Sequence, residues 1–349
     1  MAYTTINKST DYFNALTFTG DGSSSRNITG VGHQPDLVWI KNRESSSQWH
    51  FLFDAVRGAS KAIHSNVDNS ESTQASTQTA FLSDGFTVGS DSASNGNGNG
   101  IVSWNWKAGG TGSSNTNGSI TSTVSANQTA GFSIVKWTAT GSAATIGHGL
   151  GSAPKMIILK PITTSGVWLT WHTALDIKGQ VQLNETQAQY VHSGNIYWNG
   201  TLPTSTVFST GTSGSVSSSG TEYIAYCFAD VPGYSKFGSY TGNGNSNGPF
   251  NYTGFKPAFT LVKRIDSTND WNIQDTARQI YNGQDGVVLQ ANEAKSESDI
   301  GNGFARDSLS NGFKIRNTGT ETNADGGTYI YMAFGQSIVG SNNVPATAR

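Results

Sequence analysis

The feature that most constrains the fold of this chain is a short segment that occurs three times. In each copy a proline precedes five mostly apolar residues, and a lysine follows the proline by six positions, at 35–41, 154–160 and 257–263. A tryptophan stands eight residues after each of these lysines, namely Trp49, Trp168 and Trp271. Self-similarity of this kind marks repeated structural units, so the sequence predicts three copies of one unit.

Further positions recur in the same order around this segment. A strand-like stretch ending in a glycine turn precedes it, at 18–22, 137–141 and 240–244. An acidic residue and then an asparagine follow it, namely Asp54 and Asn66, Asp176 and Asn184, and Asp275 and Asn292. The first and third copies share a turn that enters a strand, at 83–86 and 310–313. All three copies close on an aromatic stretch, at 102–106, 223–228 and 329–334.

The pattern inside each copy is that of β-strands. The run after the proline is short, rich in β-branched residues and bounded by turn residues, which is typical of a strand buried on both faces. Turn signals recur at intervals of roughly 8–12 residues, as in β-sandwiches and jelly rolls. The sequence therefore predicts an all-β chain of three tandem β-sandwich repeats, either jelly-roll or concanavalin-like. The expected units are 1–112, with a short N-terminal extension, 113–232, with a lead-in rich in Ser, Gly and Asn, and 233–349.

Two stretches rich in Ser, Gly and Asn lie outside the predicted strands. Residues 92–100 are predicted to form a long flexible hairpin tip, and residues 109–117 to link the first unit to the second. Between the second and third units the chain has little slack at 230–234. We therefore expect these two units to pack closely.

Composition narrows the classes of function. Charged residues make up 13% of the chain, about half the usual share, and the formal net charge is −2. Binding to nucleic acid needs clustered cations, so we expect none. The N-terminus does not read as a secretory signal, and no apolar run approaches the ~20 residues that cross a bilayer, so no membrane insertion is expected. The single cysteine, Cys227, allows no disulfide within the chain and is expected to be a small buried residue.

The repeated lysine and tryptophan residues admit a structural and a functional interpretation. Each lysine can end a buried strand and extend to water, with its stem against the tryptophan that follows. Each tryptophan can be a core residue or a platform on which a sugar ring stacks. Recurrence after a fixed strand favours packing. The candidates for glycan stacking are Trp49, Trp168, Trp171, Trp198 and Trp271.

The sequence indicates no catalytic residue, no metal site and no cofactor. A glycosidase needs two carboxylates that face each other across a cleft, and none of the 23 acidic residues stands out as such a pair. No serine elbow, phosphate-binding loop or redox motif is recognisable. His33 and His148 lie in glycine-rich turns without the spacing of metal ligands. We therefore expect that the chain is not an enzyme.

Several strings of the sequence resemble a repeat domain of marine phages of the cyanophage and pelagiphage type. They are 32–43, 53–59, 83–89, 106–110, 118–127 and 147–151. The resemblance covers nearly the whole chain, most clearly residues 12–160. It fades in the third unit, where Arg278 keeps the place of Arg57 while the surrounding sequence differs. Members of the family are mostly described as virion structural or tail-fibre-like proteins with concanavalin-like units, which implies a class of role but no catalytic residue.

The resemblance and the composition lead to one expected role and two alternatives. We expect a non-enzymatic virion structural protein, an external fibre, knob or appendage component that takes part in host-surface attachment. The alternatives are a capsid decoration protein and a tailspike-like glycan depolymerase. The expected partners are other virion proteins, copies of the chain in a symmetric oligomer, and host-surface glycan. The expected location is the virion surface after assembly in the host cytoplasm, where a surface rich in amides and hydroxyls stays hydrated when salt screens charge.

Overall fold

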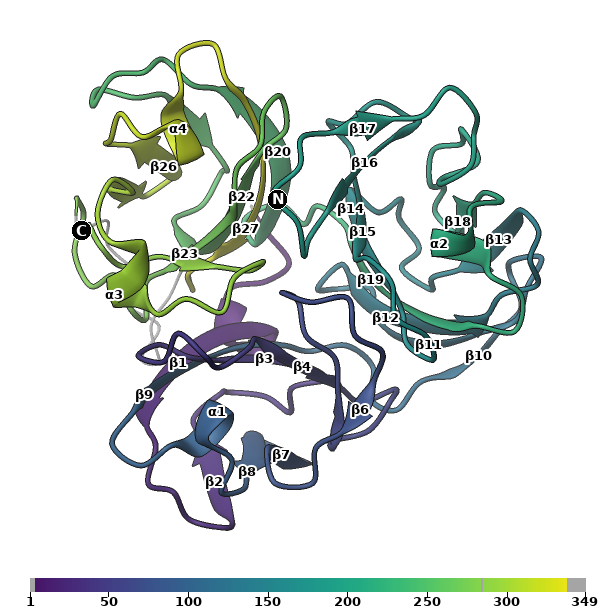
Figure 1. Cartoon of the computed structure of the whole chain (residues 1–349), viewed down its shortest axis with the longest axis horizontal. Coiled ribbons are helices and arrows are strands. Elements are labelled where there is room, and N and C mark those ends of the chain that lie inside the picture. Colours follow the sequence, from purple (N-terminus) through teal and green to yellow (C-terminus); the bar gives the residue numbers. More distant parts are fainter. Residues whose placement is uncertain (1–3, 284, 338–349) are drawn as a thin grey trace.

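The structure is a computed structural model that describes residues 4–283 and 285–337. The chain forms an all-β fold of several antiparallel sheets, as the sequence predicts. Figure 1 shows three lobes around a common centre, which follow one another along the chain from purple through teal to yellow. The lobes are called the first, second and third lobe below.

The first lobe follows a short 3-10 helix, Ser9–Asp11. Its strands are β1 (Phe13–Thr19), β2 (Arg26–Thr29), β3 (Leu37–Asn42), β4 (Phe51–Asp54), β5 (Lys61–Ala62), β6 (Ser72–Thr73), β7 (Gln78–Leu82), β8 (Gly85–Val88) and β9 (Gly100–Trp106), and its helix is α1 (Ser92–Asn95). The sheet β1-β9-β3-β4 lies toward the centre of the molecule and the sheet β2-β8-β7 lies outside it (Figure 1).

The second lobe carries the largest sheet. Its strands are β10 (Ser113–Asn115), β11 (Ser122–Asn127), β12 (Phe132–Thr138), β13 (Ala144–Gly147), β14 (Met156–Pro161), β15 (Leu169–His172), β16 (Gly179–Gln182), β17 (Tyr190–Val191), β18 (Val207–Thr210) and β19 (Glu222–Phe228), and its helix is α2 (Gly214–Ser217). The order of the large sheet is β10-β11-β12-β19-β14-β15-β16-β17, and β13 pairs with β18 in a second sheet.

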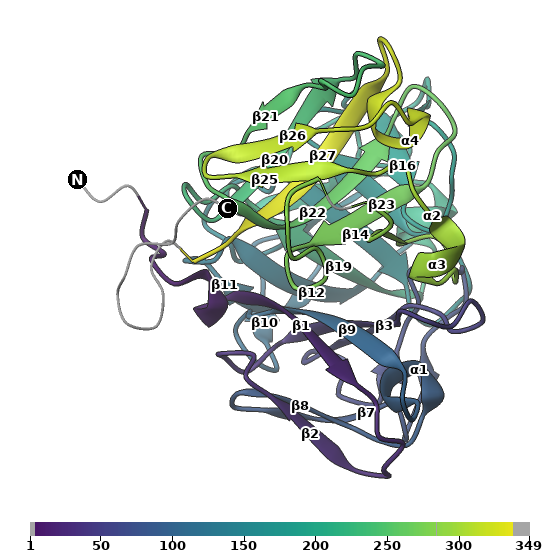
Figure 2. The same ribbon diagram turned by 90° about the vertical axis from the view of Figure 1, so that its left-hand side faces the viewer.

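The third lobe ends the described part of the chain. Its strands are β20 (Ser235–Thr241), β21 (Phe250–Tyr252), β22 (Pro257–Arg264), β23 (Trp271–Asp275), β24 (Leu289–Gln290), β25 (Arg306–Leu309), β26 (Gly312–Ile315) and β27 (Thr328–Gly335), and its helices are α3 (Glu297–Ile300) and α4 (Thr320–Asn323). The sheet β20-β27-β22-β23-β24 faces the centre, and the sheet β21-β26-β25 lies outside it (Figure 2).

The same strand order occurs in the inner sheet of every lobe. The strand after the repeated proline lies between the lobe's last, aromatic strand and the strand that follows it in sequence. On the other side of the aromatic strand lies β1, β12 or β20. The registers also correspond, with partners Leu37 and Trp106, Met156 and Phe228, and Phe259 and Phe334. Residues far apart in the sequence can therefore be compared position by position.

Each lobe has its own apolar core, and the three inner sheets share a further one. Separate clusters of buried residues fill the space between the inner and outer sheets of the first, second and third lobes. One larger cluster combines residues of all three lobes at the centre of the molecule. There the corresponding rings of Trp106, Phe228 and Phe334 contact one another, with centroids 5.8–6.4 Å apart. Because each ring removes a large apolar area from water, this central core holds the lobes together.

Glycine permits one of the recurring turns. Residues Ser83 and Asp84 connect β7 to β8, and Gly85 then begins β8 with φ +147°. A Cβ atom on Gly85 would lie 1.9 Å from the carbonyl oxygen of Ile28 on the neighbouring strand. The turn predicted at 83–86 is present, and only glycine fits its end.

One prediction about the polar stretches is wrong, and another is incomplete. Residues 92–100 do not form a flexible tip, because Asp91 Oδ1 accepts a hydrogen bond from Ala93 N at 2.8 Å and caps α1. Three of the four residues of α1, namely Ala93, Ser94 and Asn95, are buried. Residues 109–117 are not only a link, because β10 extends the large sheet of the second lobe by pairing with β11.

Candidate functional site

The most regular polar structure of the molecule lies in the three seams between its lobes. The first seam joins the first and second lobes, the second seam joins the second and third, and the third seam joins the third and first. One backbone hydrogen bond recurs in each seam, namely Glu71 N to Ile162 O at 2.9 Å, Gln189 N to Ile265 O at 2.8 Å and Glu297 N to Arg43 O at 2.9 Å. Every lobe thus donates to the next, and the third lobe donates back to the first, which closes a ring.

An asparagine and an aromatic residue reinforce this contact. The Oδ1 atoms of Asn184 and Asn292 accept hydrogen bonds from the backbone N–H of Trp168 and Trp271, both at 2.8 Å. The indole N–H of each tryptophan then crosses a seam, to His64 O at 2.7 Å and to Gln182 O at 2.8 Å. The sequence correctly aligned these tryptophans and asparagines.

In the first lobe the predicted correspondence fails by one residue. Asn66 Oδ1 accepts a hydrogen bond from the backbone N–H of His50 at 3.0 Å, so His50 takes the position that Trp168 and Trp271 have in the other lobes. Trp49 is displaced to the surface, where 38% of it is exposed. One additional residue between β3 and β4 causes the shift.

The repeated lysines do not extend to water, contrary to expectation. Lys41, Lys160 and Lys263 are fully buried. Lys160 Nζ donates to Asp68 O of the first lobe at 3.0 Å, and Lys263 Nζ donates to Thr186 O of the second lobe at 2.9 Å. Burial lowers the pKa of both groups to about 8. These ammonium groups therefore bind backbone carbonyls across the first and second seams.

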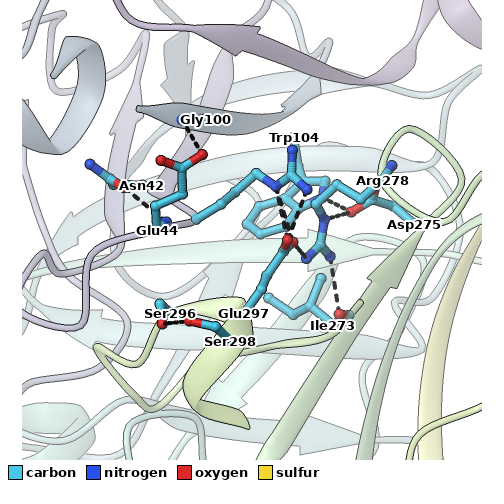
Figure 3. Close-up of polar contacts among 11 residues, drawn as sticks. Asn42, Glu44, Gly100, Trp104, Ile273, Asp275, Arg278, Ser296, Glu297 and Ser298 are labelled. Atoms are coloured by element: carbon cyan, nitrogen blue, oxygen red, sulfur yellow. Dashed lines mark hydrogen bonds and ion pairs between the residues drawn. The ribbon is translucent and has the colours of Figure 1, made fainter. Parts of the chain in front are cut away.

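The third seam contains a network of ions, shown in Figure 3. Arg278 Nε donates to Asp275 Oδ2 at 2.7 Å, and its Nη1 donates to Glu297 Oε1 at 2.6 Å. Arg43 of the first lobe approaches Glu297 from the other side, with Nη2 2.8 Å from Oε2. Trp104, also of the first lobe, donates its indole N–H to Asp275 Oδ2 at 2.9 Å.

The charges in the third seam are mutually compensated. The guanidinium of Arg278 lies 5.4 Å from the ring centroid of Trp104 and is fully buried. Burial alone would lower its pKa, but the carboxylates of Asp275 and Glu297 raise the pKa of Arg278 above its usual value. The arginine therefore stays charged and bridges two carboxylates.

The first seam repeats this arrangement with one change. Arg57 Nε donates to Asp54 Oδ2 at 2.6 Å, and its Nη1 lies 3.3 Å from Glu71 Oε2. Tyr226 of the second lobe replaces the tryptophan and donates its hydroxyl to Asp54 Oδ2 at 2.8 Å. Burial, and then the charge of Asp54, raises the pKa of Tyr226 well above its usual value, so the phenol remains a donor.

The second seam has the same backbone contact but no comparable ion pair among its corresponding residues. His172 stands where Asp54 and Asp275 stand, as the strand registers show. Its Nε2 lies 3.3 Å from Tyr331 O of the third lobe, and its Nδ1 accepts from Ala174 N at 3.1 Å. Burial lowers the pKa of His172 to about 4. The ring is therefore neutral near pH 7, with its proton on Nε2.

Two further positions of the second seam are also neutral. Leu175 follows His172 by three residues, as each seam arginine follows its aspartate. Gln189 follows Asn184 by five residues, as Glu71 and Glu297 follow their asparagines. Asp176, which the sequence aligned with the seam aspartates, does not occupy their position, because the strand register places His172 there.

Four of the five candidate glycan-stacking residues are interior. Trp168, Trp171, Trp198 and Trp271 are at most 3% exposed. Their rings pack in the cores and seams, so a sugar in solution has no access to a ring face. Trp49 alone of the five is exposed, at 38%, and its ring and that of His64 meet in a T-shaped arrangement with centroids 5.0 Å apart. For Trp49 the stacking role stays a prediction.

The seam carboxylates suit cohesion better than catalysis. Asp54 and Asp275 are fully buried, and each already accepts hydrogen bonds from an arginine and an aromatic donor. Within residues 4–283 and 285–337, no three His, Cys, Asp or Glu side chains gather in a way that could hold a metal ion. Over the same residues, no helix has the length and apolar character needed to cross a membrane.

Comparison with known proteins gives one match. The model of a family described as a domain of unknown function, DUF7483, matches residues 8–337, which include all three lobes. No curated protein and no solved structure matches the chain.

Proposed function

We propose that this chain, which belongs to the DUF7483 family, is a non-enzymatic structural protein of a virus particle. In this proposal it is an external fibre, knob or appendage component displayed on the virion surface. It acts with other virion proteins and with copies of itself, and it takes part in attachment to the host surface.

The closed ring of seams is the observation that carries the proposal. Three lobes share one central core and are joined head to tail by the same backbone contact. Such an arrangement resists separation of its parts, because opening any lobe exposes the central aromatic rings and the buried ions. A displayed component needs this cohesion outside the cell. The family model covers the three lobes together, which supports the ring as the functional module.

The finer description of the fold is part of the proposal. We interpret the three lobes as three tandem β-sandwich repeats of one ancestral unit, with boundaries at 1–112, 113–232 and 233–349. The recurring strand order and registers support this interpretation. So does the position of the separate apolar cores between an inner and an outer sheet.

A capsid decoration protein is the second candidate, and the arrangement of the lobes favours it. Three corresponding lobes around one centre give a single chain an approximate threefold shape (Figure 1). Such a shape can cover a site of threefold symmetry on a shell, since each lobe meets a similar neighbourhood. The two candidates predict different copy numbers on the particle.

Cryo-electron microscopy of intact particles tests the proposal. A small number of copies on the tail or at a vertex is the result expected for an appendage component. Hundreds of copies over the shell would replace that role by capsid decoration. Particles that are complete without the chain, with the protein only in the host lysate, would refute a virion structural role altogether.

A further inference from the structure

The outer sheet of the third lobe carries an exposed aromatic pair. This sheet has the order β21-β26-β25 and lies at the top of Figure 2. Along β21 the side chains alternate, with Phe250 and Tyr252 exposed and Asn251 buried between them. Phe250 is 44% exposed and Tyr252 is 61% exposed. Since alternate residues of a strand share a face, both rings lie on the solvent side of the sheet.

The neighbouring positions form two rows across this face. In the first row Phe250 pairs with Lys314, and Lys314 pairs with Asp307. In the second row Gly312 stands between Tyr252 and Leu309. Gly312 takes the position of Gly85 in the first lobe, and a Cβ atom there would lie 2.1 Å from the backbone oxygen of Asn251 and 2.9 Å from two ring carbons of Phe250. We call Phe250, Tyr252, Gly312, Lys314 and Asp307 the aromatic platform.

The corresponding positions in the other lobes are small or polar. By strand register, Asn27 and Thr29 of β2 occupy the places of Phe250 and Tyr252 in the first lobe. Thr145 and Gly147 of β13 occupy them in the second lobe. The fold itself therefore does not require aromatic rings at these two places. Their presence in one lobe indicates a role specific to that lobe.

Two charged side chains, those of Lys314 and Asp307, stand in the same cross-strand row as Phe250. Lys314 Nζ donates to Gly248 O at 2.9 Å and keeps further hydrogens available. Asp307 Oδ2 lies 3.3 Å from Arg316 Nε, and a carboxylate can accept more than one hydrogen bond. The exposed side chains of Asn243, Asn245 and Asn247 lie in the loop between β20 and β21. The platform thus combines apolar ring faces with donors and acceptors.

The size of the platform selects its occupant. The exposed parts of the two rings amount to roughly 200 Å². A stable protein partner needs about 800 Å² on each side, so the rings alone are too small for one. A pyranose ring has one apolar face to stack on an aromatic ring and hydroxyls at its edge.

We propose that the aromatic platform binds a hexopyranose unit of a surface polysaccharide. The apolar face of the sugar stacks on Tyr252 and Phe250, while its hydroxyls donate to Asp307 and accept from Lys314. The inference rests on the proposed role in host attachment and assigns that role to one lobe. It moves the glycan contact away from the tryptophans, most of which are buried, to two residues that the sequence did not single out.

Affinity electrophoresis of the full chain tests the platform. The protein migrates through native gels that contain soluble laminarin, dextran, galactan or mannan, and retardation reports binding to each polysaccharide. Saturation-transfer NMR with the methyl glycosides of glucose, galactose and mannose then identifies the sugar that touches the rings. We expect retardation in at least one of the four gels.

Substitutions localise the contact. The variant Phe250→Ala/Tyr252→Ala should lose about tenfold in affinity, equivalent to ~1.4 kcal/mol. A matched control is Tyr281→Ala, which removes a tyrosine that is 59% exposed outside the platform. A second control, Asn27→Ala/Thr29→Ala, changes the corresponding positions of the first lobe. Both controls should bind like the unchanged protein, and thermal unfolding checks that every variant is folded.

Three results would overturn the inference. The first is a folded protein that no polysaccharide retards, and the second is a platform variant with unchanged retardation. The third is a dimer in sedimentation velocity that Phe250→Ala/Tyr252→Ala converts to a monomer, since the rings would then serve a second copy. None of these affects the virion role, because the protein's place on the particle is measured separately.

Discussion

The third and second seams perform the same task with different chemistry. In the third seam Asp275, Arg278 and Glu297 form a buried network of ions. In the second seam the corresponding positions carry a neutral histidine, a leucine and a glutamine, yet the backbone bond is retained at 2.8 Å. The comparison teaches that the geometry of the ring comes from the central core and the backbone. Desolvation offsets much of the attraction between buried ions. A neutral set of side chains can therefore fill the same positions as the ion network.

The largest expected effect comes from removing the buried arginine of the third seam. Arg278→Leu leaves Asp275 and part of Glu297 buried without their arginine, which should cost about 3–5 kcal/mol of unfolding free energy. The double variant Asp275→His/Arg278→Leu introduces the second seam's residues at two of the three positions, leaves Glu297 with Arg43, and should regain at least half of that loss. Urea unfolding measures both.

Arg316→Leu is the matched control for this experiment. It removes a partly exposed arginine of the same lobe, whose pair with Asp307 is open to solvent, and should change stability by less than about 0.5 kcal/mol. A double variant no more stable than Arg278→Leu would show that the third seam cannot adopt the neutral chemistry of the second.

The second expected effect is a dependence on pH that belongs to the second seam. Burial holds the pKa of His172 at about 4, below its value of about 6.5 in the unfolded chain. The unfolded state therefore binds a proton first as the pH falls, and stability is lost between about pH 6.5 and about pH 4. When the pH falls from about 7.5 to about 5, this one residue should lower the free energy of unfolding by about 2 kcal/mol.

The variant His172→Gln isolates that contribution from the other buried histidines. Burial also lowers the pKa values of His33 and His64 to about 4, so the unchanged protein loses more stability in acid than one residue explains. Urea unfolding at the two pH values should show a smaller loss for His172→Gln. Equal losses in the two proteins would mean that His172 is not a source of the acid sensitivity.

A smaller effect is expected from the first seam. Tyr226→Phe removes one donor from Asp54 but leaves Arg57 in place, so the carboxylate keeps its charge partner. A hydrogen bond to a charged group contributes about 1.5–3 kcal/mol, and the remaining contacts place this variant at the lower end. Thermal and urea unfolding should agree on this loss. Stability equal to that of the unchanged protein would show that the tyrosine contributes only its ring.

The smallest effect is expected at the rim of the same seam. Lys61 lies 3.7 Å from Glu71 and its side chain is 42% exposed. Solvent screens this pair, so Lys61→Ala should change the free energy of unfolding by less than about 0.5 kcal/mol. A loss above 1.5 kcal/mol would assign the rim a share of the cohesion that we attribute to the buried groups.

The sequence predicted the parts of the fold that depend on local order. The proline-headed strands, the closing aromatic strands and the asparagines of the seams lie where their recurrence indicated. The position of His50 was missed because one added residue breaks the fixed spacing on which the alignment depended. The burial of the lysines was missed because their partners are carbonyls of another lobe, which no local pattern reveals.

The seams and the aromatic platform could be recognised only from the three-dimensional structure. An aspartate followed by an arginine three residues later occurs at 54–57 and at 275–278, and this spacing was the one available signal for the ion pairs. Its replacement by His172 and Leu175 hides the correspondence in the second lobe. Phe250 and Tyr252 flank one buried residue in a strand of three residues, which is too short for a periodicity to stand out.

The head-to-tail seams also bear on how such a protein can change over time. In a trimer of identical chains any substitution appears at all three contacts at once, so the three contacts cannot change independently. Here the three contacts lie on one chain, and a substitution alters a single seam while the remaining two keep the ring shut. Each lobe can therefore acquire its own outer surface. The three lobes also stay distinguishable from one another, whereas the subunits of a homotrimer are equivalent.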